Sequence, residues 1–192
     1  MRRREVITLL GGAAAAWPVV ALAQQPAVPV IGFLNTQSPG SFAHMLSGFH
    51  QGMRDGGIYE GQNVRIEYRW AEGQSERLPE LAKDLARHGL AAIVATGGES
   101  AAYAAKAATQ TIPVVFLIGG DPVKEGLVAS INSPGGNVTG VTLLTAEIEG
   151  KRLGLLRQLM PKASLIAVLI NPDFPPAENQ RRDILEAASR VD

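Results

Sequence analysis

The short apolar run Val30–Asn35 constrains the fold of this chain more than any other feature. Five apolar residues lead directly into the polar turn Thr36–Pro39. A run this short, rich in branched and aromatic side chains, is typical of a strand that is buried on both faces. Strands of this kind belong to parallel sheets that helices cover on both sides. The run therefore predicts an α/β fold.

Strand-like and helix-like segments alternate from Val30 to Met160, which indicates a doubly wound parallel sheet with right-handed crossovers. Further strands are expected over 63–70, 91–96, 112–118 and 138–144, and helices over 42–55, 75–88, 99–109 and 147–160. The segment 63–70 alternates strictly between apolar and polar residues, so we place it at a sheet edge. Its Tyr68 and Trp70 are expected to pack in the core rather than stack on a ligand.

Apolar stripes orient two of these helices. In the first helix, Ser41 is the expected N-cap, and five residues are expected on the buried side: Phe42, Met45, Leu46, Phe49 and Met53. In the helix expected over 147–160, three leucines are expected to point inward: Leu155, Leu156 and Leu159.

The opening pattern returns at Ile166–Asn171, where an apolar run again ends in Asn and Pro175 follows four positions later. We interpret Leu165–Ile170 as the first strand of a second, similar domain, with a chance likeness as the alternative. The chain then divides into an export signal (1–23), a first α/β domain (24–144) and the beginning of a second domain (145–192), with a helix from Ala177.

The N-terminal residues have the pattern of a signal peptide. A basic start, Arg2–Arg4, precedes an apolar stretch of small residues, and Ala21–Ala23 forms a small-x-small cleavage site before Gln24. The Arg pair resembles a twin-arginine signal, but Val6 stands where Phe is usual. We therefore predict export with cleavage after Ala23 and leave the route open between the general secretory and twin-arginine systems. The alternative is an uncleaved membrane anchor.

Composition excludes several classes of function. With 18 Lys and Arg against 18 Asp and Glu, the chain has no basic excess, so nucleic acid is not an expected partner. Without cysteine it has neither disulfides nor thiolate metal sites. His44 and His50 lie on roughly opposite sides of one predicted helix and cannot share a metal. We expect no metal and no cofactor.

Polar residues and glycines gather where the predicted strands end. In open α/β sheets the ligand binds beyond the carboxyl ends of the strands, and the candidate ligand-binding residues there are Asn35, Ser38, Gly97, Gly98, Ser100, Asp121 and Pro122. The Gly97–Gly98 pair at a helix start suits a ligand carboxylate, provided that the Glu99 side chain turns away. Asp121 is suited to a ligand ammonium, although an Asp-Pro pair is also an ordinary turn former.

No catalytic motif is present. The chain contains neither a GxGxxG after the first strand nor a P-loop nor a GxSxG elbow. We predict a protein that is not an enzyme and has no catalytic residues. The alternatives are a small α/β enzyme, such as a hydrolase or reductase of flavodoxin-like shape, and the ligand-sensing domain of a receptor.

Several stretches together resemble the substrate-binding proteins of ABC importers that have the type 1 periplasmic binding fold, in particular the tryptophan/tyrosine-type family. The stretches that carry the likeness are Val30–Asn35, Glu60–Val64, Ile66–Gly73, Ala104–Thr109, Ile112–Phe116, Gly119–Val123, Gly126–Ser130 and Pro134–Val141. The Gly119–Val141 part is the most specific, and the matches extend to about Pro172.

The resemblance implies two α/β domains that close around a cleft, with Thr139 and Gly140 as hinge candidates in the first crossing between them. It also implies a periplasmic protein that binds a small molecule, an amino acid or a small aromatic compound, and delivers it to an ABC permease in the inner membrane. Family members are usually much longer, so the resemblance implies a C-terminally truncated chain. An incomplete second domain would expose apolar surface, from which we predict weak solubility or self-association.

Overall fold

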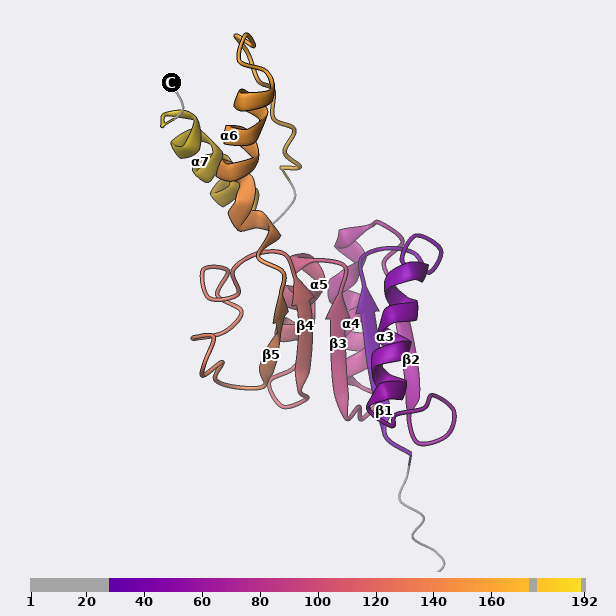
Figure 1. Ribbon diagram of the computed structural model, residues 1–192. Coiled ribbons are helices and arrows are strands. Elements are labelled where there is room, and N and C mark those ends of the chain that lie inside the picture. The colour runs from indigo at the N-terminus through magenta and orange to yellow at the C-terminus, as the bar shows by residue number, and fades with distance from the viewer. Residues whose placement is uncertain (1–27, 173–175, 191–192) are drawn as a thin grey trace, which may run out of the picture.

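The computed structural model describes residues 28–172 and 176–190, so the expected signal peptide lies outside the described residues. Five parallel strands form one sheet in the order β2-β1-β3-β4-β5 (Figure 1). The strands are β1 (Val30–Asn35), β2 (Arg65–Trp70), β3 (Ala92–Thr96), β4 (Val114–Ile118) and β5 (Val138–Thr142). The helices are α3 (Ala43–Asp55), α4 (Leu78–Ala86), α5 (Glu99–Ala108), α6 (Glu149–Leu159) and α7 (Ala177–Ala188). The predicted parallel α/β sheet is confirmed.

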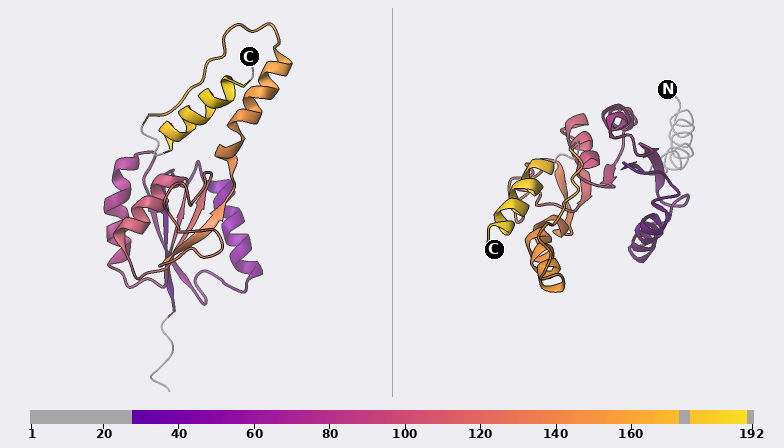
Figure 2. Two further views of the ribbon diagram at one scale, coloured as in Figure 1. Left: turned by 90° about the vertical axis from the view of Figure 1, so that its left-hand side faces the viewer. Right: turned by 90° about the horizontal axis from the view of Figure 1, so that it is seen from above.

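The direction of each crossover determines which face its helix covers. From β1 to β2 the chain moves one way along the sheet, and from β2 through β3 and β4 to β5 it moves the other way. Because crossovers are right-handed, α3 lies on one face, and α4 and α5 lie on the other (Figure 2). Strand β2 is at the edge, as its alternating sequence predicts.

The face under α4 and α5 carries the larger core. Small residues of α5 allow close packing on β3 and β4, and leucines of α4 fill the space above β1 and β2. Fully buried members of this core include Leu34, Leu78, Ala82, Leu85, Ile93, Ala101, Ala105 and Val114.

The face under α3 has an aromatic core centred on Phe33, which is fully buried. The Phe33 ring centroid lies 5.1 Å from that of Phe49 and 5.5 Å from those of Tyr68 and Trp70, all in tilted arrangements. Tilted contacts at such distances are favourable for aromatic pairs. The expected core packing of Tyr68 and Trp70 is confirmed.

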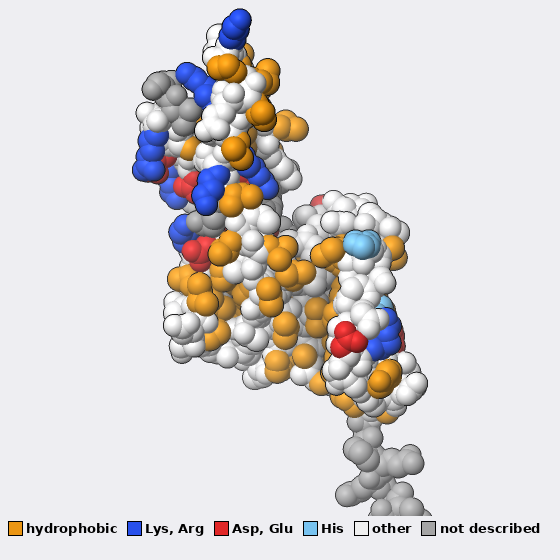
Figure 3. All heavy atoms as spheres, in the orientation of Figure 1, with side chains coloured by type: hydrophobic (Ala, Val, Ile, Leu, Met, Phe, Trp, Pro, Cys, Tyr) orange, Lys and Arg blue, Asp and Glu red, His pale blue; other side chains and the backbone are white. Residues whose placement is uncertain are grey.

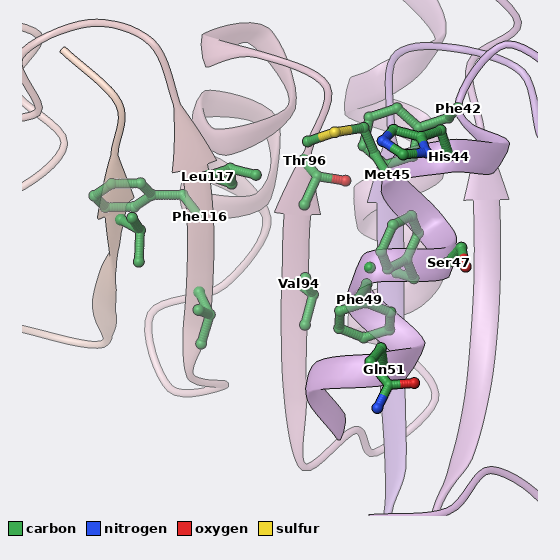
Figure 4. A pocket seen from close by; sticks show the side chains of 14 residues that line it. Phe42, His44, Met45, Ser47, Phe49, Gln51, Val94, Thr96, Phe116 and Leu117 are labelled. Carbon is green, nitrogen blue, oxygen red and sulfur yellow. The ribbon is translucent and has the colours of Figure 1, made fainter. Parts of the chain in front are cut away.

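Strand β5 approaches β4 closely because residue 140 is glycine. A Cβ built on Gly140 would lie 2.3 Å from the carbonyl oxygen of Phe116 and 2.6 Å from its ring. The Phe116 side chain is buried and lies over β5 (Figure 4). Because backbone atoms of a paired strand cannot move aside, only glycine fits this position.

Three expectations about α3 and α6 are wrong. Met45 is largely exposed, because α3 faces β1 and β2 and Met45 lies on the side toward the uncovered strands. Phe42, not Ser41, is the N-cap residue of α3, and the Ser41 hydroxyl instead bonds to Ser38. The inward orientation of the α6 leucines also fails, since α6 lies above the sheet and packs on α7 (Figure 1). The exposed residues are Leu155, Leu156 and Leu159.

The predicted strand at Leu165–Ile170 is not formed. This segment is extended chain without strand pairing, and Leu169 is fully exposed. A strand needs a hydrogen-bonded neighbour, and none of the strands in the described part of the chain lies beside it. The repeat of the Val30–Asn35 sequence pattern therefore does not produce a repeated structure here.

Among the residues that the structure describes, no helix is long and apolar enough to cross a membrane.

Substitution of Gly140 by Ala should destabilise the fold, because the added methyl group would overlap the Phe116 carbonyl. We expect a loss of about 1–3 kcal/mol in the free energy of unfolding, measured by urea denaturation. The matched control is Gly52→Ala in α3, where a Cβ meets nothing within 4 Å. That variant should gain about 0.5–1 kcal/mol, as is usual for Gly→Ala inside an exposed helix. If both substitutions changed the free energy of unfolding by the same amount, the close approach of β5 to β4 would be contradicted.

A charge cluster joins edge strand β2 to α4. Arg69 donates from Nε to Asp84 Oδ2 over 2.7 Å, and His88 Nδ1 lies 2.5 Å from Glu67 Oε2. The hydrogen bond from His88 is the main cause that lowers the pKa of the Glu67 carboxyl, with the charges of His88, Arg65 and Arg69 acting in the same direction. The hydrogen bond from Arg69 likewise lowers the pKa of Asp84. These carboxylates therefore stabilise the fold in their ionised form.

A carboxyl whose pKa is lowered on folding stabilises the folded state above its unfolded pKa, and this contribution is lost as the pH falls below about 4.5. Urea denaturation from about pH 6 to about pH 3.5 should thus show a steeper loss of stability for the wild type than for Glu67→Gln. The control is Glu80→Gln, because Glu80 is exposed and pairs with the exposed Lys83. Identical pH profiles for the wild type and Glu67→Gln would show that ionised Glu67 contributes nothing to the stability of the fold.

Candidate functional site

The carboxyl ends of all five parallel strands lie at one edge of the sheet, which is the upper edge in Figure 1. The predicted site residues therefore belong to loops that share this rim. The ends of β1 and β4 are two strands apart in the sheet, which corresponds to about 10 Å. A small molecule can span that separation.

Asn35 links two of the rim loops from a fully buried position. Its Nδ2 donates to Thr96 Oγ1 over 2.8 Å, and its Oδ1 accepts from the backbone N–H of Gln37 over 2.7 Å. Both ends of the amide thus satisfy protein groups, as buried polar groups must. In this arrangement Asn35 shapes the rim, and its predicted direct contact with a ligand stays a prediction.

Gly97 is required by the close approach of the β1 and β3 loops. Its φ of +86° is in the left-handed region, and a Cβ there would lie 2.7 Å from Asn35 Oδ1. Gly98 follows with a φ of +116° and is the N-cap residue of α5. Ser100 is half-buried in the first turn of α5. These residues place the backbone of the α5 N-terminus at the rim.

Glu99 turns toward the neighbouring loop. Its Oε1 accepts hydrogen bonds from the backbone N–H groups of Gly119 and Gly120, over 3.1 and 2.8 Å. The side chain is only 3% exposed. The Glu99 carboxylate therefore binds the loop after β4 instead of projecting into solvent.

Asp121 forms a turn while remaining partly exposed. Its Oδ1 accepts from the backbone N–H groups of Val123 and Lys124, over 2.8 and 3.2 Å, which is the ordinary turn-forming role of Asp. The second carboxylate oxygen, Oδ2, takes no part in these two hydrogen bonds. Pro122 is buried, and its carbonyl accepts from Leu127.

Ser38 lies at the far side of the rim, after β1. Its hydroxyl is 3.0 Å from Ser41 Oγ, so the two serines close the turn that precedes α3. A buried hydroxyl nearby, Thr36 Oγ1, is the one buried side-chain polar atom in the described residues without a hydrogen-bond partner. Thr36 belongs to the polar turn that the sequence places beyond the first strand, but the local sequence does not predict that its hydroxyl is buried.

A polar cleft of about 470 Å³ separates the loop after β4 from α7. Asp121 and Gly120 line one side. The opposite wall is the polar side of α7, with Asn179, Gln180, Arg182, Asp183 and Glu186. None of these α7 residues is among the ligand-binding candidates that the sequence predicts. The spacing of Asn179, Asp183 and Glu186 at i, i+4 and i+7 is the signal that would have indicated one polar face.

A larger groove of about 710 Å³ lies on the face of the sheet that carries α3, between α3 and strands β4 and β5. Apolar side chains line most of it, including Met45, Phe49, Val115 and Val141 (Figure 4). It is the sheet face that α3 leaves uncovered, and hydrophobic side chains gather there in Figure 3. Its lining comes mainly from α3 and from the faces of the strands, not from the loops beyond the carboxyl ends of the strands, where open α/β sheets bind their ligands.

The titratable groups of the described residues do not meet the requirements of a metal site. The described residues contain no cluster of three or more His, Cys, Asp or Glu that could hold a metal ion. Tyr103 donates to Glu125 Oε2 over 2.8 Å. Burial, and then this hydrogen bond, raise the pKa of Tyr103 above its usual range. Tyr103 is thus a neutral hydrogen-bond donor at physiological pH.

Residues 28–192 match the family described as ABC transporter substrate binding protein. The chain belongs to this family. The tyrosine-binding protein of Clostridioides difficile (strain R20291) is 34% identical over 127 residues, which cover 65% of this chain and 35% of that relative. The chain therefore spans about a third of the length of this curated substrate-binding relative.

Two solved structures extend the comparison. The ABC domain from Streptococcus pneumonia in complex with L-Trp superposes with a TM-score of 0.74 at 25% identity, covering 86% of this chain and 55% of that one. A conserved domain protein from Vibrio cholerae reaches a TM-score of 0.77 at 24% identity, over 85% of this chain and 54% of that one. The second likeness shows the fold alone.

The hinge candidates of this family member lie within the sheet. Thr139 pairs with Val115 and Gly140 with Phe116 in the β4–β5 ladder. The chain leaves the ladder only after Leu143, whose N–H donates to the Ile118 carbonyl over 3.0 Å. Leu144 then adopts a φ of +49°. A hinge at Thr139 and Gly140 stays a prediction, as does the domain boundary after residue 144.

Proposed function

We propose that the protein is the periplasmic solute-binding component of an ABC importer and binds an amino acid or a small aromatic compound. The single observation that carries the proposal is the polar cleft between Asp121 and α7, which opens at the carboxyl ends of the strands. Membership of the substrate-binding family supports it. The L-Trp bound in the Streptococcus pneumonia structure also supports it.

In this proposal the two charged ends of an amino acid meet different parts of the rim. Asp121 offers a partly exposed carboxylate to the ligand ammonium. The α5 N-terminus at Gly97, Gly98 and Ser100 offers backbone N–H groups to the ligand carboxylate, since the Glu99 side chain is turned toward the next loop. The bound solute would pass to a permease in the inner membrane, the expected partner.

Binding should depend on the Asp121 charge. Asp121→Asn retains an oxygen that can accept from Val123 and Lys124, so the turn persists while the charge is lost. We expect this variant to bind L-tryptophan and tryptamine about tenfold or more weakly than the wild type, measured by calorimetry. Affinity for indole-3-propionate, which lacks the amine, should be unchanged.

The matched control is Asp55→Asn, because Asp55 lies at the exposed end of α3 and accepts a hydrogen bond from Gln51. If Asp121→Asn weakened all three compounds equally, Asp121 would have no specific role toward the ammonium. If the wild type bound none of the amino acids or aromatic acids tested, the proposed ligand class would be wrong.

Export to the periplasm rests on the sequence of the first 23 residues. Because alanine occupies the first and third positions before Gln24, the mature chain is expected to begin there. N-terminal sequencing of the protein from the periplasmic fraction checks this. A chain that still begins at Met1, or one found only in the cytoplasm, would contradict it.

A further inference from the structure

Glu99 is the only charged residue among those that the structure describes as buried, with 3% of its surface exposed. A buried carboxylate is costly unless hydrogen bonds replace its lost hydration. Glu99 begins α5, where the helix dipole favours a negative charge. Dipole and burial alone, however, do not explain why the side chain reaches across to another loop.

The Glu99 side chain binds the backbone that follows β4. A single oxygen, Oε1, accepts from Gly119 over 3.1 Å and from Gly120 over 2.8 Å. Two successive glycines are the most flexible dipeptide that a loop can contain. Hydrogen bonds to both of their N–H groups therefore restrict this loop where it would otherwise be least defined.

The same two glycines are held from the opposite side by the segment that leaves β5. Thr142 Oγ1 donates to the Gly120 carbonyl over 2.5 Å, and the Thr145 hydroxyl lies 3.5 Å from the Gly119 carbonyl. A Cβ on Gly119 would lie 2.7 Å from Thr145 Oγ1, so the contact needs glycine. The N–H groups thus face α5, and the carbonyls face the crossing toward α6.

We propose that Glu99 is a positioning residue: it fixes the Gly119–Gly120 loop and thereby sets both the location of Asp121 and the start of the crossing from β5 to α6. Asp121 follows Gly120 directly, so any displacement of the loop moves the Asp121 carboxylate. The part of this inference that concerns ligand affinity rests on the proposed function. The part that concerns the loop stands on the hydrogen bonds alone.

Three proteins test the role of Glu99: the wild type, Glu99→Gln and Glu99→Ala. Glutamine keeps an oxygen that can accept from Gly119 and Gly120, whereas alanine removes it. Amide hydrogen exchange by NMR measures the protection of these two N–H groups directly. Calorimetry with L-tryptophan as the probe measures affinity. Glu80→Ala, which removes an exposed carboxylate from α4, is the matched control.

Glu99→Ala should accelerate exchange at Gly119 and Gly120 about tenfold or more and weaken L-tryptophan binding about tenfold. Glu99→Gln should remain within about threefold of the wild type in both measurements, because acceptor geometry rather than charge holds the loop. Unchanged protection in Glu99→Ala would overturn the proposal. The proposal would also be overturned if Glu99→Gln changed amide exchange and L-tryptophan affinity as much as Glu99→Ala does. A wild type that fails to bind L-tryptophan counts against the proposed function, while the exchange rates still decide the role of Glu99.

Discussion

The parallel register between β1 and β3 is the constraint on which the rim depends. It pairs Asn35 with Thr96 at the last position of both strands, so the buried amide meets the hydroxyl within hydrogen-bonding distance. That bond brings the two following loops so close that residue 97 must be glycine. A slip of one residue would turn Asn35 to the other face of the sheet, and the junction would be lost.

Much of the fold follows from local sequence patterns, because each pattern matches a period that the backbone imposes. The alternation in β2 predicts its edge position and the burial of Tyr68 and Trp70. The same reasoning fails at Leu165–Ile170 and for the α6 leucines. Strand formation and helix burial there depend on a neighbouring layer, and a short apolar run carries no information about whether that neighbour is present.

The candidate site is less predictable than the fold, for a related reason. Position at a strand end is a local property, and it identifies the loops that form the rim. Burial of the individual side chains is not local. Asn35 is buried by the loop after β3, whereas the polar face of α7 reaches the rim from residues about sixty positions beyond Asp121. Only the periodicity of polar residues within α7 gives a hint of that face.

Glu99 and Asp121 show how burial separates two chemically similar groups. Both are carboxylates that accept two backbone hydrogen bonds through one oxygen. Glu99 is enclosed by α5 and the loop after β4, so its hydrogen bonds hold loops in place. Asp121 lies one residue beyond that loop, at the wall of the polar cleft, where its carboxylate is accessible to a charged partner. The buried acid gives the exposed one a defined position, which is the preorganisation that a binding site requires.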